Sequence, residues 1–152
     1  MKLSNRSIYA IRAVFDLAFL GGGQATQIKD IAERQSIPSR FLEQIFQDLK
    51  RAGIVGAKRG PRGGYHLAQA PEAIRVGDVV RAVEGAVVSL APSGEAEAPR
   101  ESISETVTGE LFQALTQQIE RSFDEVTVAS LAERAEALSS RRGPPRRYSY
   151  SI

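Results

Sequence analysis

The sequence predicts a mainly α-helical chain with one small β-hairpin and, after it, a long amphipathic helix. Apolar residues recur at helical spacing in several segments of the 152-residue chain, as expected of helices with one buried face. One stretch instead combines glycine, proline and arginine between two short apolar runs, a pattern typical of a hairpin. Apolar residues make up 42% of the chain, which is enough for one modest core.

The first expected helix begins at Asn5, which we assign as its N-cap. Apolar residues follow at helical spacing as far as Ala18, and the glycines at 21–23 end the helix. Thr26 is expected to cap a second, short helix, which the Ser-Ile-Pro sequence at 36–38 terminates.

The third expected helix runs from about Pro38 to Ala52, because proline is tolerated in a first helical turn and Gly53 follows. Its expected buried face consists of Phe41, Leu42, Ile45, Phe46 and Leu49. A short helix, a tight turn and a longer helix form the outline of a helix-turn-helix. The third helix also has a polar face, made of Ser39, Arg40, Glu43, Gln44 and Gln47. Such side chains can contact base edges or phosphates, although most polar helix faces are simply solvated.

The stretch RGPRGGYHL, residues 59–67, is expected to form the tip and second strand of the hairpin. A phosphate-binding loop would need Lys-Ser/Thr after its last glycine and a helix behind it, whereas the flanks here are strand-like. Glycines keep such a tip slim enough for a DNA minor groove, and arginines supply positive charge there. The candidate DNA-contacting residues at the tip are Lys58, Arg59, Pro61, Arg62 and Gly63. Because a hairpin after a helix-turn-helix is a wing, we expect residues 1–85 to form a winged helix-turn-helix DNA-binding domain, with an ordinary exposed hairpin as the alternative.

The charge distribution favours the same interpretation. Residues 1–69 contain 11 basic and 5 acidic side chains, a net charge of +6. Residues 70–139 contain 5 basic and 13 acidic side chains, a net charge of −8, and residues 140–152 add four arginines. A basic first half joined to an acidic middle indicates a nucleic-acid-binding part and a part with another role.

The second half is expected to begin with a short helix after Pro71, with valines on its apolar face and Gly85 at its end. Residues 86–103 are small, acidic and proline-containing, and are expected to form a flexible loop. A long amphipathic helix should follow from about Ser104 to Asp124, roughly 30 Å in length. Pairing with its copy in a second subunit would cover such a helix, and packing across the N-terminal helix of the same chain is the alternative.

Thr127 is expected to cap a last helix that ends near Leu138. We therefore expect residues 104–138 to contain the dimerisation helix and a terminal helix. Residues 139–152 are expected to form a flexible C-terminal tail.

No catalytic site, metal site or cofactor is expected. The chain has no cysteine and one histidine, His66, which is expected to be an ordinary strand residue, and no paired acidic motif suggests acid–base catalysis. Arg12 and Asp16 interrupt the apolar run near the N-terminus, unlike the core of a signal peptide. No window approaches the length of a membrane span. We expect a cytoplasmic protein that is not an enzyme and does not bind a membrane.

The chain resembles the Rrf2 family of bacterial winged helix-turn-helix repressors, which includes the iron–sulfur cluster regulator IscR and the cysteine metabolism repressor CymR. The resemblance lies in four segments: YAIRAVFDLA (9–18), IKDIAERQSIPSRFLEQIFQDLKRAGIV (28–55), RGPRGGYHLA (59–68) and VGDVVRAVEG (76–85). It implies a homodimer that places each third helix in a major groove and each wing in the flanking minor groove of an inverted-repeat operator. It also places Arg40 and Gln44 at recognition positions, Glu43 on the same side, and Arg59 at the wing arginine.

The chain also differs in one respect from the cluster-binding members of the family. Cluster-binding members of the family carry three cysteines in the loop before the long helix, whereas this chain has none. It therefore resembles the cluster-free branch and is closest in character to CymR. CymR-like members are controlled by complex formation with cysteine synthase, an enzyme that accepts partner C-termini ending in isoleucine. This chain ends in RRYSYSI, so Tyr148, Tyr150 and Ile152 are candidate partner-binding residues.

The resemblance thus implies a repressor of cysteine or sulfur metabolism that is controlled through cysteine synthase. Two other interpretations of the tail remain: a frayed terminus, or arginines that add DNA affinity. Two other functions also remain. One is a cluster-free regulator that senses a small molecule at the dimer interface, and the other is an interaction protein that modulates an enzyme through its tail.

Overall fold

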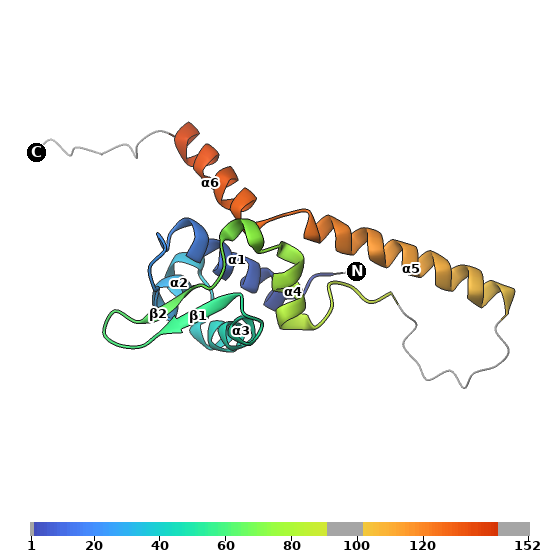
Figure 1. The fold of residues 1–152 in the computed structure, drawn as a ribbon, viewed down its shortest axis with the longest axis horizontal. Helices are drawn as coiled ribbons and strands as arrows, with labels where there is room; N and C mark the ends of the chain where they lie inside the picture. Colours follow the sequence, from blue (N-terminus) through green and yellow to red (C-terminus); the bar gives the residue numbers. More distant parts are fainter. Residues whose placement is uncertain (1, 91–101, 143–152) are drawn as a thin grey trace, which may run out of the picture.

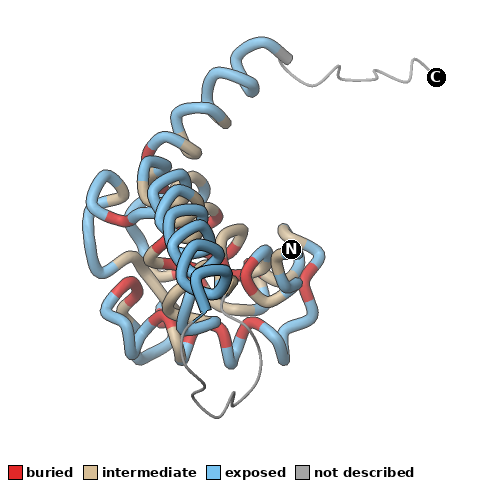
Figure 2. Tube along the Cα trace, turned by 90° about the vertical axis from the view of Figure 1, so that its right-hand side faces the viewer, coloured by how far each residue is buried: buried red, intermediate tan, exposed pale blue. Residues whose placement is uncertain are grey.

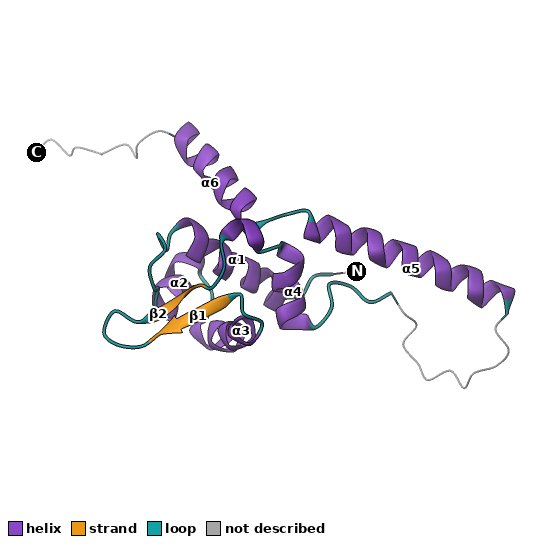
Figure 3. Ribbon diagram, viewed as in Figure 1, coloured by secondary structure: helices purple, strands orange, loops and turns teal. Residues whose placement is uncertain are grey.

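The computed structural model describes residues 2–90 and 102–142, which form a helical body, a hairpin and two further helices (Figure 1). The elements are α1 (Asn5–Phe19), α2 (Ile28–Gln35), α3 (Ser39–Arg51), β1 (Val55–Lys58), β2 (Gly64–Leu67), a 3₁₀ turn (Pro71–Ala73), α4 (Val76–Glu84), α5 (Ile103–Asp124) and α6 (Val128–Arg142). The two strands form one antiparallel sheet beside α3 (Figure 3). The predicted fold class, mainly helical with a small hairpin wing, is confirmed.

The core lies between α1, α2, α3 and α4, and the base of the hairpin closes it. Its largest fully buried apolar side chains are Phe46, Ile31, Leu42, Ile45, Leu49 and Ile74. Four of these six come from the apolar face of α3, and their burial holds α3 firmly against the body. Phe41 was expected on the buried face of α3, but it is 43% exposed. It lies at the start of α3, where its ring contacts that of Tyr9 at the rim of the body.

Two expected helix caps were wrong. Ser4, rather than Asn5, caps α1, since its Oγ accepts a hydrogen bond from the Ser7 N–H at 3.0 Å. Gln27, rather than Thr26, precedes α2. Thr26 is instead buried, because its backbone N–H and carbonyl both pair with Tyr65 of β2 at 2.8 Å. The expected break after α2 is present, with Ser36 in the left-handed conformation at a φ of 53°.

The wing, defined here as residues 55–67, is attached to the body at its base. In β2, Tyr65 stacks on Phe46 of α3 with ring centroids 4.5 Å apart. The same residue forms the bridge to Thr26 in the segment before α2. The wing is thus fixed to α3 by stacking and to the α2 side by two backbone hydrogen bonds.

Gly64 is a position where the backbone of the wing lies very close to the body. It has a φ of 145°, and a Cβ there would overlap with the Thr26 carbonyl oxygen. We expect Gly64→Ala to lower the free energy of unfolding by on the order of 3 kcal/mol, because strained backbone and a steric clash combine. Gly60→Ala is the matched control: its φ is 108°, but a Cβ there meets nothing within 4 Å. Urea denaturation of both variants would measure the difference, and equal losses would show that the approach to Thr26 is unimportant.

Helix α5 extends away from the body and contacts it mainly through α4, near its own C-terminal end (Figure 1). It begins with a capping box between Ser102 and Glu105, whose backbone and side-chain hydrogen bonds lower the pKa of the Glu105 carboxyl. None of its residues is buried, and it is exposed along almost its whole length in Figure 2. The alternative in which the long helix packs across α1 is therefore not what the chain adopts.

Helix α6 is longer than expected. Thr127 caps it as predicted, since its Oγ1 accepts from the Ser130 N–H at 3.1 Å. The helix continues to Arg142 rather than ending near Leu138, so the expected tail boundary at residue 139 was too early. The strong helix breakers, Gly143 and Pro144, come only after Arg142.

Several expectations fall on residues 91–101 and 143–152, outside the described part of the chain. They concern most of the expected loop and the candidate partner-binding residues Tyr148, Tyr150 and Ile152. Among the described residues, no helix combines the length and apolar character needed to cross a membrane.

Candidate nucleic-acid interface

Helix α3 presents a polar face opposite the four side chains that it buries. The five candidate residues are all exposed: Ser39, Arg40, Glu43, Gln44 and Gln47. They repeat at intervals of three and four residues, so they lie along one side of the helix. This face carries both donors and acceptors, the chemistry needed for hydrogen bonds to base edges in a major groove.

Arg40 is positioned by its neighbour. Its guanidinium carbon lies 5.0 Å from the centroid of the Phe41 ring, within cation–π range. The partial exposure of Phe41 therefore has a structural consequence, since the ring provides a platform for Arg40 in the first turn of α3. An Arg held in this way keeps its guanidinium fork available for a phosphate or a guanine edge.

The tip of the wing is a tight turn that presents cations. The Gly63 N–H donates to the Gly60 carbonyl at 2.9 Å and closes the turn. Lys58, Arg59, Pro61 and Arg62 are all exposed around it. Gly63 differs from the expectation that it belongs to the contact surface: it is buried, and a Cβ there would overlap with the Lys58 carbonyl oxygen. Its role in the wing is to allow this turn.

The exposed cations of this surface differ from three arginines that tie helices of the body together. Arg34 pairs with Asp16, Arg81 pairs with Asp78 and Asp124, and Arg6 pairs with Asp48. Among the described residues, no ion pair involves Arg40, Lys58, Arg59 or Arg62. Four exposed cations without carboxylate partners form a surface that attracts an external polyanion.

Two interactions between helices of the body were not predicted from the sequence. Asp16 of α1 is fully buried and accepts from Arg34 Nε at 3.0 Å and from Gln35 Nε2 at 2.9 Å. The hydrogen bond from Arg34 to Asp16 raises the pKa of the Arg34 guanidinium. A carboxylate between Phe15 and Leu17 in an apolar run is the sequence signal for this pair, because a buried acid needs a cationic partner. The second interaction, between Arg6 and Asp48, ties α1 to α3.

His66 behaves as an ordinary strand residue. It pairs in register with Gly56, and its imidazole lies over that glycine, where an added Cβ would be 2.7 Å from Nε2. In the described part of the chain, no three histidine, cysteine, aspartate or glutamate side chains are arranged to hold a metal ion.

The chain matches a known family over most of its length. The model of the Rrf2 family, described as an iron-dependent transcriptional regulator, matches residues 3–134. The chain belongs to the Rrf2 family. The matched region covers the helix-turn-helix, the wing, α4, α5 and part of α6.

Individual Rrf2-type proteins are similar over most of their length. An HTH-type transcriptional regulator of Synechocystis sp. is 36% identical over 143 residues, which cover 94% of this chain and 95% of that protein. The structure of T. potens IscR superposes with a TM-score of 0.73 at 32% identity, covering 99% of this chain and 97% of that one. CymR, the global cysteine regulator of B. subtilis, gives 0.71 at 29% identity, covering 88% and 98%. These relatives are regulators, and the chain is a transcriptional regulator of the same IscR/CymR-like kind.

The family description implies iron, and this Rrf2 chain does not fit an iron–sulfur cluster held by cysteines. It has no cysteine to supply the thiolates that such clusters require. The described residues contain no alternative group of metal-ligating side chains. The chain therefore lacks the donor atoms that a cysteine-held cluster would need.

Proposed function

We propose that the chain is a homodimeric repressor that binds an inverted-repeat DNA operator. The observation that carries the proposal is the set of unpaired, exposed cations on the wing beside the exposed polar face of α3. Neutralising phosphates with such cations supplies most of the non-specific affinity of DNA-binding proteins. Such a repressor acts where the chromosome is, in the cytoplasm.

In this proposal, α3 enters the major groove. Gln44 offers a bidentate amide that suits adenine, while Arg40 at the start of the helix suits guanine or a phosphate. Glu43 can accept from cytosine N4 and would repel a phosphate, so it tunes sequence preference. Ser39 and Gln47 lie at the two ends of the same face and provide further polar contacts.

The wing would enter the adjacent minor groove. Its turn is slim because residues 60 and 63 are glycines, and Pro61 stiffens it. Arg59 and Arg62 would supply positive charge where a narrow minor groove concentrates negative potential, and Lys58 would contact the flanking backbone. Stacking of Tyr65 on Phe46 keeps the wing at a fixed position beside α3.

The homodimer rests on α5. Its exposed apolar side chains are Ile103, Val107, Leu111, Phe112 and Leu115. Ile103 is 86% exposed and Leu111 is 53% exposed, which is unusual for side chains that gain about 1.5–3 kcal/mol from full burial. A second copy of the same stripe would cover them through an isologous contact.

The experiment that tests DNA binding is selection from a random-sequence duplex library by the purified full-length chain. The proposal predicts enrichment of an inverted repeat whose half-sites lie about one or two helical turns apart. Recovery of no motif, or of a single unrepeated motif, would contradict a dimeric regulator.

We further propose that the regulated genes belong to cysteine or sulfur metabolism and that cysteine synthase is the partner. The likeness to the B. subtilis global cysteine regulator and the absence of cysteine in this chain support this choice. The C-terminal Ile152 carboxylate, with Tyr148 and Tyr150 behind it, would enter the active-site cleft of the enzyme. Backbone amides capture such terminal carboxylates well.

Calorimetry of the peptide RRYSYSI with the cognate cysteine synthase tests this partner. The peptide should bind, and a peptide lacking the final isoleucine should bind at least about tenfold more weakly, since the apolar side chain would no longer be buried. O-acetylserine should displace the full peptide, because substrate and tail would occupy one site. Equal binding of both peptides, or no binding, would remove cysteine synthase from the proposal and leave the DNA-binding function intact.

A further inference from the structure

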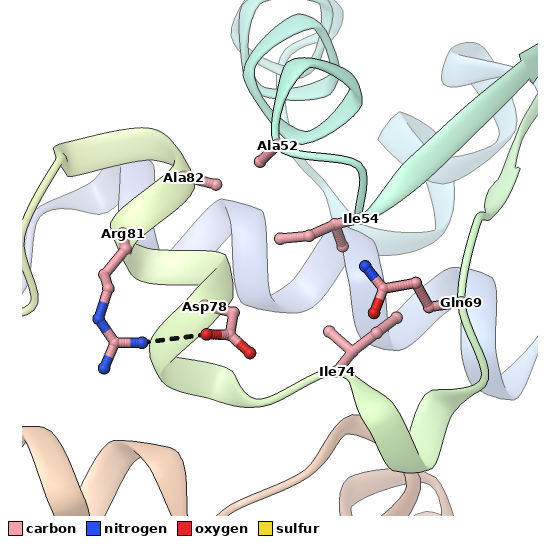
Figure 4. A pocket seen from close by; sticks show the side chains of 7 residues that line it. All are labelled: Ala52, Ile54, Gln69, Ile74, Asp78, Arg81 and Ala82. Atoms are coloured by element: carbon pink, nitrogen blue, oxygen red, sulfur yellow. Dashed lines mark hydrogen bonds and ion pairs between the residues drawn. The ribbon is translucent and has the colours of Figure 1, made fainter.

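The C-terminal end of α5 is joined to α4 by an ion pair between Arg81 and Asp124. Arg81 Nη2 of α4 donates to both carboxylate oxygens of Asp124, at 2.7 and 2.6 Å. The other terminal nitrogen of Arg81 donates to Asp78, one turn earlier in α4, at 3.1 Å (Figure 4). The hydrogen bonds to Asp124 raise the pKa of the Arg81 guanidinium. Asp78 holds the Arg81 guanidinium from its own helix while Arg81 contacts Asp124, so the contact limits rotation of α5 about its end.

The backbone adds two hydrogen bonds at the same place. The Val76 N–H at the start of α4 donates to the Val126 carbonyl at 2.8 Å. The Val128 N–H at the start of α6 donates to the Ile74 carbonyl at 2.9 Å. The chain between α5 and α6 is therefore paired, strand-like, with the chain just before α4.

Gly77 completes the contact. A Cβ at this position would overlap with the Asp124 carboxylate and lie 3.0 Å from Arg81 Nη1. The carboxylate of Asp124 thus lies directly on the backbone of α4, at the one kind of residue that leaves room for it. A glycine inside a helix costs roughly 1 kcal/mol relative to alanine, so this close approach is maintained at the expense of helix stability.

The length of α5 amplifies any change at this contact. Its 22 residues span about 33 Å, and most of that length does not touch the body. A tilt of about 10° at one end would displace the far end by roughly 6 Å, which corresponds to nearly two base-pair steps of DNA. The angle between α5 and the body therefore determines how far apart two recognition helices lie in a dimer paired through α5.

We propose that Gly77, Arg81 and Asp124 form a rigid joint that sets the half-site spacing accepted by the dimer. The proposal rests on the dimeric DNA-binding function given above. These three residues are positioning residues: they lie on α4 and α5 and belong neither to the polar face of α3 nor to the tip of the wing. Their loss should therefore leave the binding of one half-site unchanged and relax the requirement for one spacing.

The test uses the full-length chain and the inverted repeat that the wild type selects. Fluorescence anisotropy is measured on that duplex, on versions with the spacer changed by one or two base pairs, and on a duplex with one half-site. Asp124→Ala should lose about tenfold in affinity on the selected duplex, the scale expected for a lost hydrogen-bonded ion pair. It should stay within about twofold of the wild type on the half-site and discriminate less between spacers.

Two further variants make the result specific. Gly77→Ala should also make the affinity depend less on spacer length, because the added Cβ displaces the Asp124 carboxylate. The double variant should bind the selected duplex as tightly as Asp124→Ala alone. Glu125→Ala, which removes the neighbouring exposed carboxylate, should behave as the wild type. A conservative change, Arg81→Lys, keeps the charge but replaces two separate terminal nitrogens, one for Asp78 and one for Asp124, with a single ammonium group. It should therefore also make binding less dependent on the spacer length.

Three results would contradict the proposal that this joint sets the half-site spacing. The first is an unchanged dependence of affinity on spacer length in Asp124→Ala. The second is an equal loss of affinity on the half-site and on the full operator in both Asp124→Ala and Arg81→Lys. The third is an effect of Glu125→Ala as large as that of Asp124→Ala. Failure of the underlying function gives a different result, since the wild type itself would then select no inverted repeat.

Discussion

Leu111→Glu is expected to convert the proposed homodimer into monomers and to weaken operator binding by roughly 10²- to 10⁴-fold, the loss that follows when two linked contacts become independent. Leu111 lies in the middle of the apolar stripe of α5 and is 53% exposed in the single chain. In the dimer, the new carboxylate would be buried against apolar side chains without a cation, which is strongly unfavourable. The fold of the body should be unaffected, because no residue of α5 is buried within one chain.

The matched control is Gln113→Glu. It also adds one negative charge to an exposed position of α5, but it lies about 200° around the helix from Leu111. Sedimentation velocity should give a monomer for Leu111→Glu and a dimer for Gln113→Glu. If Leu111→Glu remains dimeric, the stripe on α5 is not the subunit interface.

Arg59→Ala and Gln44→Ala are expected to weaken DNA binding in distinguishable ways. Removing the wing arginine should lower affinity for all sequences and reduce the slope of log K against log salt by about 1, because one fewer counterion is released. Removing the Gln44 amide should cost about 1–3 kcal/mol on the selected operator and relax the choice of one base pair, with little change in the salt slope.

The control for both is Arg121→Ala, which removes a positive charge from an exposed position of α5, outside α3 and the wing. Binding isotherms at several salt concentrations, on the selected operator and on single-base variants, separate the two effects. Equal, salt-independent losses for Arg59→Ala and Gln44→Ala would contradict the assignment of the wing to the minor groove and of α3 to the major groove.

The sequence alone predicted the elements whose signals are local. The 3.6-residue period of Leu42, Ile45 and Leu49 determines both the buried and the polar face of α3. The glycines and Pro61 locate the wing, because few other patterns allow so tight a turn. These two elements carry the candidate DNA-contacting residues, so most of that surface could be assigned before the structure.

The sequence-based predictions were wrong where tertiary contacts override the local structural preference of a residue. Thr26 has the chemistry of an N-cap, but its backbone is used by the bridge to Tyr65. Gly63 looks like a component of an exposed tip, but the turn buries it. The joint had no sequence signal at all, because Arg81 and Asp124 are 43 residues apart and Gly77 is an ordinary glycine in the pattern of α4.

The most direct test of the central claim is the stoichiometry and specificity of the complex. Sedimentation of the wild-type chain with its selected duplex, compared with a scrambled duplex at the same salt concentration, measures both. The account predicts two chains per selected duplex and no stable complex with the scrambled one. One chain per duplex, or equal binding to both duplexes, would contradict a dimer that uses α3 and the wing to recognise an inverted repeat.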